Sequence, residues 1–361
     1  MSAYAISCGG TGGHLSPGIA VAEELTRRNK KCLLLVSEKL IDGVMLKKYS
    51  NFDSIVLSAK PFSKNFKKFW QFLKAQMISF FECIKLIREK KITCVIGMGG
   101  FTNVPIVLAA FVLRKKIALH ESNRIVGKSI KILSYFADVI FLPEEIEFGN
   151  GFLRRKTIQA TFPLRHEIHK INKSKARNIL SLSEDGFVLT VLGGSQGAEA
   201  LNQWAVANME QLNAHGIALC CVRGIKSDKN EIVEGKSGSG STVRNAFLSF
   251  CNDMSMLLSA TDLLVCRAGA GTIAEAAFFS LPMILVPYPN SADNHQQANA
   301  AYVEKKGAAL VVNEDNIEVL LETVLESFMQ KLKNFNIDDS VDPKKSEVEI
   351  IVDCIQQMER L

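Results

Sequence analysis

Four glycine-rich loops follow short apolar segments, and this repeated pattern restricts the fold more than any other feature of the sequence. The loops lie at residues 9–13, 97–100, 193–197 and 269–271. Continuous apolar strands that alternate with helical segments are typical of a parallel sheet covered by helices on both faces. In such sheets ligands bind beyond the carboxyl ends of the strands, where these loops would lie. The sequence therefore predicts a doubly wound α/β protein with ligand-binding loops.

The pattern of strand, glycine loop and helix starts again after residue 168, which indicates two domains. The length of 361 residues also exceeds the size at which a single hydrophobic core stops growing. We expect a Rossmann-like N-terminal domain over residues 1–163 and a second one over residues 164–337. Residues 338–361 would form a tail helix. This helix could pack against the N-terminal domain. The Gly- and Ser-rich stretch at residues 234–245 is expected to be an exposed loop.

Charge is divided unevenly between the two halves of the chain. Residues 1–163 contain 25 Lys and Arg against 12 Asp and Glu, whereas the remainder contains 18 against 25. A basic half indicates an anionic partner such as a phosphate, a nucleic acid or an acidic membrane.

Neither a membrane span nor a metal site is expected. The longest apolar run, residues 104–113, is shorter than the roughly 18 residues of a spanning helix. The N-terminus lacks the basic flank and apolar core of a secretory signal. Nine cysteines form no C-x-x-C pair and six histidines form no ligand cluster, so we expect buried free thiols in a cytoplasmic protein.

The glycine loops suit phosphate binding but do not match the common nucleotide motifs. A loop that leads from a strand into a helix presents unpaired backbone N–H groups at the positive end of the helix dipole. Four such loops indicate a ligand with more than one phosphate or sugar. The dinucleotide pattern G-x-G-x-x-G fails because Leu15 occupies its third glycine position. A P-loop match at residues 122–129 fails because Ser122 replaces its first glycine.

Six motifs together resemble the MurG glycosyltransferases, in the order seen in that family. They are GGTGGH at residues 9–14, GMGGF at 97–101, HESN at 120–123, GGSQGA at 193–198, CRAGAGTIAE at 266–275 and DNHQQANA at 293–300. The resemblance implies the GT-B fold, two Rossmann-like doubly wound parallel-sheet domains with a cleft between them. It implies an inverting transfer of N-acetylglucosamine (GlcNAc) from UDP-GlcNAc to the 4-OH of MurNAc in undecaprenyl-pyrophosphoryl-MurNAc-pentapeptide (lipid I). The product would be lipid II for peptidoglycan, formed with no cofactor and no metal at the diphosphate.

His14 is the candidate base, because an inverting transfer must remove the proton of the attacking hydroxyl. A histidine, whose unperturbed pKa is about 6.5, suits that role at neutral pH. Orienting the loop, or binding the acceptor phosphate, are the alternatives for this side chain. We place His14 at the end of the first glycine loop, before a helix expected from about residue 17 to residue 29.

The resemblance also implies the residues around the two substrates. Glu275 would bind the ribose hydroxyls and Gln296 the GlcNAc hydroxyls, whereas Arg267 could support the leaving diphosphate or be a buried structural arginine. Contacts to UDP-GlcNAc are expected from Thr11, Gly12, Gly13, Asn123, Arg165, Ser195, Gln196, Cys251, Arg267, Gly269, Ala270, Gly271, Thr272, Glu275, Gln296 and Gln297. On the acceptor side we expect Gly99, Gly100 and Glu121. The chain departs from the family pattern at residues 101–105 (FTNVP) and at Arg124, which leaves the detailed acceptor contacts open.

A basic and aromatic helix is expected to bring the protein to its lipid substrate. Apolar residues recur at helical spacing between residues 66 and 87, flanked by lysines and arginines. This composition is typical of helices that lie in a membrane interface. We expect Phe66, Phe69, Trp70 and Leu73 to face the membrane and the later part, which includes Met77, to be core. The partners would be UDP-GlcNAc, lipid I and the anionic cytoplasmic face of the bacterial plasma (inner) membrane, bound peripherally, with no nucleic acid.

Three other functions remain open at this point. Another GT-B UDP-sugar glycolipid synthase would keep the basic half and the UDP loops but change the acceptor. A UDP-GlcNAc 2-epimerase would share the fold without a lipid partner. A non-catalytic protein that binds nucleotide sugars is the third.

Overall fold

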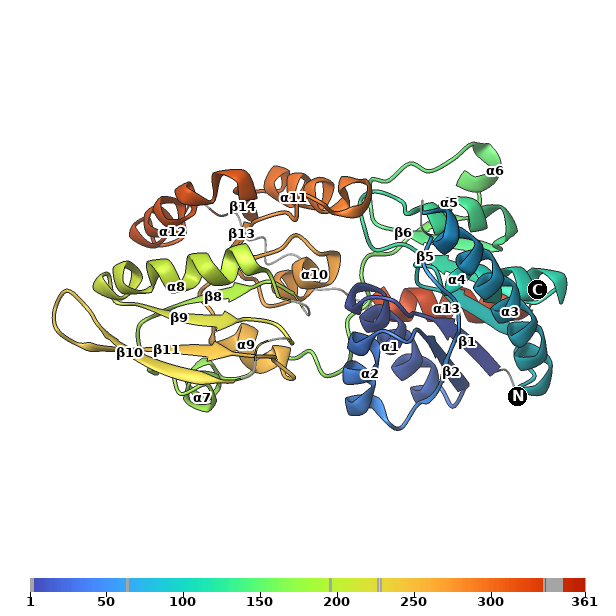
Figure 1. Ribbon diagram of the computed structural model, residues 1–361, viewed down its shortest axis with the longest axis horizontal. Coiled ribbons are helices and arrows are strands. Elements are labelled where there is room, and N and C mark those ends of the chain that lie inside the picture. Colours follow the sequence, from blue (N-terminus) through green and yellow to red (C-terminus); the bar gives the residue numbers. More distant parts are fainter. Residues whose placement is uncertain are drawn as a thin grey trace. The chain divides into compact units, whose positions relative to one another are not determined.

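The computed structural model describes residues 3–62, 65–194, 197–225, 227, 229–333, 335 and 347–360 of the chain (Figure 1). Two compact units divide the chain. Unit 1 comprises Met1–His166 together with Pro343–Leu361, and unit 2 comprises Glu167–Asp342. Each unit is built on one sheet of seven strands.

The sheet of unit 1 is parallel throughout and has the strand order β3-β2-β1-β4-β5-β6-β7. Alternate residues of β1, an inner strand of this sheet, belong to two cores, since successive side chains of a strand point to opposite faces. Ala5 lies in one core, while Tyr4 and Ile6 lie in the other. The strands are β1 Ala3–Ser7, β2 Lys31–Val36, β3 Asp53–Val56, β4 Cys94–Gly97, β5 Lys116–His120, β6 Val139–Leu142 and β7 Thr157–Gln159.

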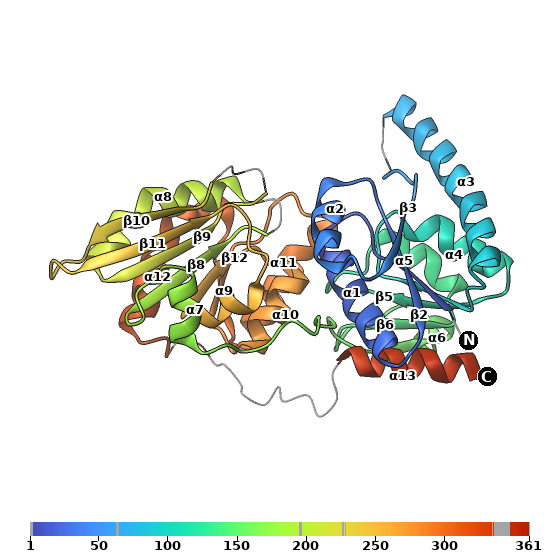
Figure 2. The same ribbon diagram turned by 90° about the horizontal axis from the view of Figure 1, so that it is seen from below.

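Helices cover both faces of this sheet, as expected for a doubly wound fold. Buried residues of α3 and α4 complete one core, and those of α1 and α13 complete the other (Figures 1 and 2). The helices of unit 1 are α1 Gly12–Arg27, α2 Leu40–Leu46, α3 Phe66–Glu89, α4 Asn103–Val112, α5 Lys128–Leu133, α6 Gly151–Arg154 and α13 Glu347–Arg360.

α1 begins five residues earlier than the sequence predicted. Its first residue is Gly12 and its N-cap is Thr11, so that His14 lies in the first helical turn rather than in the preceding loop. Proline is favoured in the first turn of a helix, but Pro17 lies inside α1, beyond its first turn. Gly12 and Gly13 form the added turn at the start of the helix, although glycine is a weak helix former.

α3 departs from the prediction at Met77. Met77 was expected in the core but is 60% exposed, and Phe81 on the same helix is 62% exposed. Ile87 is buried, and Phe80 and Ile84 pack against the core as expected. The outer stripe is therefore longer than the four residues predicted.

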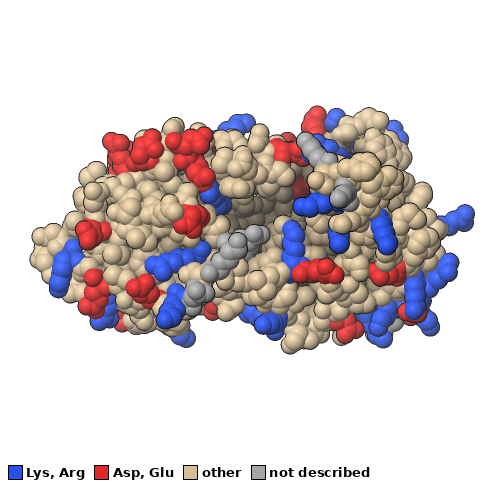
Figure 3. All heavy atoms as spheres, viewed as in Figure 1, with Lys and Arg blue, Asp and Glu red and all other residues tan. Residues whose placement is uncertain are grey.

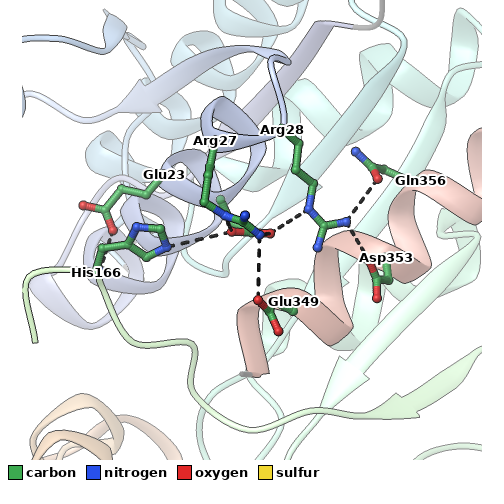
Figure 4. A network of polar contacts seen from close by, with 8 residues as sticks. Glu23, Arg27, Arg28, His166, Glu349, Asp353 and Gln356 are labelled. Carbon is green, nitrogen blue, oxygen red and sulfur yellow. Dashed lines mark hydrogen bonds and ion pairs between the residues drawn. The ribbon is translucent and has the colours of Figure 1, made fainter. Parts of the chain in front are cut away.

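α13 is fastened to α1 by a network of charged side chains (Figure 4). The carboxylate of Glu24 is 1% exposed and accepts hydrogen bonds from Arg27 at 2.7 Å and from Arg28 at 2.6 Å. These hydrogen bonds hold the pKa of Glu24 below its ordinary value. Arg28 also donates to Asp353 of α13 at 2.6 Å, and Arg27 lies 3.8 Å from Glu349. The last described helix therefore belongs to the structure of unit 1.

The sheet of unit 2 has the order β10-β11-β9-β8-β12-β13-β14, and its strands are parallel except for the β10–β11 hairpin. That hairpin corrects the prediction of a loop at residues 234–245, because only residues 237–241 form a turn. The serines and glycines of the turn made this region look like a loop in the sequence. They drew attention away from the alternation of exposed and buried residues at the start of β11, where Val243 and Asn245 are buried. The strands are β8 Phe187–Leu192, β9 Ile217–Val222, β10 Glu231–Lys236, β11 Thr242–Leu248, β12 Leu263–Cys266, β13 Met283–Leu285 and β14 Ala309–Val311.

Unit 2 packs α8 and α12 against one face of its sheet, where Leu201, Trp204 and Val324 are buried with residues of β8 and β9. The doubly wound α/β fold is thus confirmed in both units. In the described part of the chain, none of the helices combines the length and the hydrophobicity needed to cross a bilayer. The helices of unit 2 are α7 Lys173–Ile179, α8 Glu199–Ala214, α9 Met254–Ala260, α10 Ala270–Phe278, α11 His295–Lys305 and α12 Leu320–Met329.

Candidate functional site

Two glycine loops of unit 1 meet around the imidazole of His14. Thr11 Oγ1 lies 3.1 Å from His14 Nδ1, and a Cβ built on Gly99 would lie 2.9 Å from His14 Nε2. Gly100 is equally close, since its Cβ would come within 3.1 Å of Nδ1. Gly99 and Gly100 have φ angles of +101° and +79°, which glycine adopts readily. The structure therefore brings together His14, Thr11 and the two glycines that the sequence singled out.

The side chains of Asn103 and Thr102 form hydrogen bonds with these loops and with the end of β1, a role that the sequence did not predict. With its amide oriented to satisfy its neighbours, Asn103 accepts from Gly99 N at 2.7 Å and donates to Ser7 O at 3.1 Å. Thr102 Oγ1 accepts from Ser7 Oγ at 3.1 Å and donates to Gly9 O at 3.4 Å. Both side chains are fully buried. The departure from the family pattern at FTNVP thus contributes to the loop scaffold.

Glu121 holds the loop that follows β5. Its carboxylate accepts from Asn123 N and Asn123 Nδ2, both at 2.9 Å, and from Gly127 N at 2.8 Å. The side chain is 6% exposed, so these bonds compensate the burial of a charge. Next to it, His120 is buried and its Nε2 lies 3.1 Å from Thr161 O. Burial lowers the pKa of His120, and the hydrogen bond to Thr161 and the charge of Glu121 offset only part of this shift.

Arg165, a predicted donor contact, is the penultimate residue of the first segment of unit 1. Its Nη1 donates to the hydroxyl of Tyr49 at 3.0 Å. The next residue, His166, donates its backbone N–H to Glu23 at 2.8 Å, and its ring lies 3.8 Å from Glu24 (Figure 4). The segment that leaves unit 1 is therefore attached to α1 as well.

In unit 2 the loop after β8 packs tightly against the end of β9. A Cβ on Gly197 would lie 2.1 Å from Arg223 O, and one on Gly193 would lie 2.3 Å from Ala198 N. Both positions therefore require glycine. The predicted contacts Ser195 and Gln196 lie outside the described residues.

α10 begins at Ala270, with Gly269 as its N-cap. Gly271 and Thr272 follow in its first turn, and Glu275 is 7% exposed one turn later. The first-turn N–H groups of a helix this long are a suitable site for an anion.

Arg267, which precedes this helix, is bound by protein groups. Its guanidinium donates to Val286 O at 3.1 Å and to Pro287 O at 3.4 Å, and it pairs with the carboxylate of Glu314. The residue is 8% exposed and lies over the ring of Tyr288. These contacts describe the buried structural arginine that the sequence left as an alternative.

The remaining predicted donor contacts lie in the loop after β11 and in the first turn of α11. Gln296 Oε1 accepts from Tyr288 N at 2.9 Å, whereas its neighbour Gln297 is exposed. Cys251 is half-buried, and its thiol donates to Asp253 O at 3.1 Å.

The thiols of six cysteines are buried and unoxidised, as the sequence predicted, while three others are half-buried. Burial raises the pKa of Cys266 to about 12, so this thiol stays protonated at neutral pH. Among the residues that the structure describes, no group of three His, Cys, Asp or Glu side chains could hold a metal ion.

Charge on the surface follows the asymmetry of the sequence. Figure 3 shows acidic side chains gathered over the region of α12, while lysines and arginines are more numerous over unit 1. The exposed acidic residues of that region are Asp315, Glu318, Glu322 and Glu326.

Comparison with known proteins covers the whole chain. Residues 4–142 match the glycosyltransferase family 28 N-terminal domain, and residues 188–353 match the glycosyltransferase family 28 C-terminal domain. A relative from Opitutus terrae is 37% identical over 365 aligned positions, which cover 100% of this chain and 96% of the relative. A relative from Prochlorococcus marinus strain MIT 9215 is 33% identical and covers 91% of this chain and 87% of its own length. Both are named UDP-N-acetylglucosamine–N-acetylmuramyl-(pentapeptide) pyrophosphoryl-undecaprenol N-acetylglucosamine transferase.

Solved structures agree on the fold. The crystal structure of Acinetobacter baumannii MurG has a TM-score of 0.73 at 21% identity, covering 99% of both chains. The Streptomyces sp. SF2575 glycosyltransferase SsfS6, complexed with thymidine diphosphate, has a TM-score of 0.60 at 13% identity and covers 100% of both chains. The architecture is therefore GT-B. Taken with the identity to the curated relatives, these matches show that the chain belongs to glycosyltransferase family 28 and, within it, to the MurG enzymes.

Proposed function

We propose that this chain transfers GlcNAc from UDP-GlcNAc to the C4 hydroxyl of MurNAc in lipid I, with inversion, to form lipid II. The observation that carries the proposal is the similarity along the entire chain to relatives named for this transfer. A glycosyltransferase of this kind needs a base at the acceptor hydroxyl and N–H donors at the departing diphosphate.

The proposal makes His14 the base. If Nδ1 carries the ring proton and donates it to Thr11 Oγ1, the basic lone pair lies on Nε2, which is the atom next to Gly99. A hydroxyl brought to the surface of the β4–α4 loop could then pass its proton to Nε2 as its oxygen attacks the anomeric carbon. Gly99 and Gly100 leave room for the acceptor beside the imidazole because they have no side chains.

Unit 2 would bind the donor. The first turn of α10, with Gly271 and Thr272, supplies backbone N–H groups for the diphosphate that leaves with a negative charge. Glu275 would accept hydrogen bonds from the ribose and Gln296 would bind the GlcNAc hydroxyls. The amide of Gln296 offers both a donor and an acceptor, as a sugar diol requires.

A transfer assay tests this proposal directly. The protein is incubated with labelled UDP-GlcNAc and a short-chain lipid I analogue, and the products are separated by chromatography. We expect a labelled disaccharide lipid and release of UDP, both dependent on the acceptor. Hydrolysis or epimerisation of UDP-GlcNAc without disaccharide would contradict the proposal and favour one of the alternative enzymes.

We also propose that the start of α3 holds the protein peripherally at the cytoplasmic face of the bacterial inner membrane. Figure 2 shows the first half of α3 projecting past the sheet of unit 1. Phe66 is 76% exposed and Trp70 is 57% exposed, while Phe69 and Leu73 are half-buried. Phe62, which is 63% exposed, contacts Phe69 edge to face with ring centroids 6.1 Å apart.

The charges beside this aromatic cluster favour an anionic surface. Lys68, Lys74 and Lys85 are exposed on the same helix. Basic side chains next to exposed aromatic rings are typical of helices that lie in the headgroup region.

The double variant Phe66→Ser with Trp70→Ser replaces the two most exposed aromatic residues at the start of α3. We expect its partitioning into phosphatidylglycerol vesicles to fall by about tenfold or more, because two large side chains no longer enter the interface. Flotation measures the bound fraction at low and high salt. Met329→Ser is the matched control, since Met329 is 64% exposed on α12 of unit 2 and its loss should not change binding. Equal binding of wild type and the double variant would rule out this surface.

A further inference from the structure

Asp42, a residue that neither the motifs nor the predicted substrate contacts include, is attached to the first glycine loop. It lies in the first turn of α2, and its side chain is fully buried. Asp42 Oδ2 accepts from Gly10 N at 2.8 Å, from Ser37 N at 3.0 Å and from Ser37 Oγ at 2.6 Å. A carboxylate of α2 thus joins the end of β2 to the loop that follows β1.

The carbonyl group of Gly10 is also bound by a residue at the start of α2. Lys39, the N-cap of α2, donates from Nζ to Gly10 O at 2.7 Å. Gly10 has a φ of +111°, and a Cβ there would lie 3.1 Å from the ring of Phe101. Both peptide groups of Gly10 are therefore bound, its N–H by a carboxylate and its C=O by an ammonium group. Hydrogen bonds to charged groups are the strong ones.

Gly10 directly precedes the turn that orients His14. Thr11 is the N-cap of α1, and its carbonyl accepts from His14 N and Leu15 N, each at 3.1 Å. Its hydroxyl lies 3.1 Å from His14 Nδ1. A rotation of the peptide at Gly10 would therefore move the hydroxyl that lies beside the imidazole.

The burial of Asp42 is hard to explain by stability alone. All three hydrogen bonds converge on Oδ2, and within the described residues Oδ1 is buried with no hydrogen-bond partner. A carboxylate in such a place loses hydration that one oxygen does not recover. Costs of this kind are tolerated where a backbone conformation must be fixed.

We propose that Asp42 is a positioning residue for catalysis, which fixes Gly10 and through it the imidazole of His14. The inference rests on the proposed GlcNAc transfer for its kinetic consequence, but its structural consequence at His14 does not. Lys39 supports the same peptide from the solvent side.

The test compares Asp42→Ala with Asp42→Asn, which keeps one oxygen that can accept the bonds from Gly10 and Ser37. We expect kcat to fall about 100-fold in Asp42→Ala and about tenfold in Asp42→Asn, with the KM for UDP-GlcNAc within about twofold of wild type. In ring-labelled protein, the NMR signals of His14, assigned with His14→Ala, should shift in both variants. UDP affinity measured by calorimetry should stay unchanged, because Glu275 and the first turn of α10, which would bind the ribose and the diphosphate, belong to unit 2.

Asp138→Asn is the matched control. Asp138 accepts from Ile117 N at 2.8 Å, a carboxylate-to-backbone bond at the amino end of a strand of the same sheet. It should leave kcat and the His14 signals unchanged. If Asp42→Ala does not fold, Asp42→Asn and Lys39→Ala test the proposal in its place. Lys39→Ala is expected to lower kcat and to shift the His14 signals by a smaller amount in the same direction.

Folded Asp42 variants with wild-type His14 signals and wild-type kcat would overturn the inference, as would a loss of thermal stability alone. If the wild-type protein fails to transfer GlcNAc, the proposed function fails. In that case a shift of the His14 signals in the Asp42 variants would still support the positioning of the imidazole.

Discussion

His14→Ala is expected to lower kcat for GlcNAc transfer by about 10³-fold, within the range that a positioned general base contributes. The KM for UDP-GlcNAc should change by less than about threefold, since most of the expected donor contacts belong to unit 2. The imidazole lies 3.1 Å from Thr11 Oγ1 and against two glycines, a setting that holds it without covering it, as the residue is only half-buried. Single-turnover rates with saturating donor measure the effect on the chemical step.

The pH dependence separates a base from a residue that only orients the loop. Wild-type kcat/KM should fall as the pH is lowered and His14 becomes protonated, because only the neutral imidazole accepts a proton. This limb should be absent in His14→Ala. His215→Ala serves as the control, since His215 is an exposed residue of unit 2 whose Nδ1 lies 2.9 Å from Gln211 O. Near-normal turnover of His14→Ala would remove the residue from catalysis.

Gly99→Ala is expected to reduce kcat by about 100-fold while the protein stays folded. The added methyl would lie 2.9 Å from His14 Cδ2 and Nε2, so the imidazole must move away from the place where the acceptor hydroxyl would meet it. The φ of +101° adds backbone strain of about 1–2 kcal/mol for a residue with a Cβ. Initial rates and thermal unfolding measure these two effects separately.

Gly186→Ala isolates the strain from the displacement of His14. Gly186 has nearly the same backbone angle, with a φ of +107°, but a Cβ there meets nothing within 4 Å. This variant should lose a similar amount of thermal stability and keep its turnover. If both alanine variants lose activity equally, the close contact between Gly99 and His14 does not explain the effect.

Local sequence was sufficient to predict the elements that bring the loops together. Apolar runs such as residues 94–97 become buried strands, and the glycines after them mark the carboxyl end of each sheet. The glycine cluster at residues 193–197 is visible in the sequence, and the structure gives its reason, since a Cβ on Gly193 or Gly197 would overlap backbone atoms. These features follow from strand burial and from backbone geometry, which a single stretch of sequence records.

Residues that act on these loops from other elements could not be predicted in this way. Asp42 is 32 positions from Gly10, and in the sequence it reads as an ordinary acid in the first turn of a helix. Asn103 reads as a departure from a family motif, and only packing shows that it binds Gly99. The α13 contacts join residues more than 300 positions apart. Such pairs depend on topology, since no local spacing relates them.

The position of α13 has a consequence for the order in which the protein matures on the ribosome. Val348, Ile351, Val352 and Ile355 fill one core of unit 1, although this helix is made after all of unit 2. Nascent domains usually fold in the order of their synthesis. Here unit 2 has its complete sequence once Asp342 has emerged, while the core of unit 1 still lacks the apolar residues of α13. The half that is translated first is therefore the last to close its core, and it is the half that carries His14.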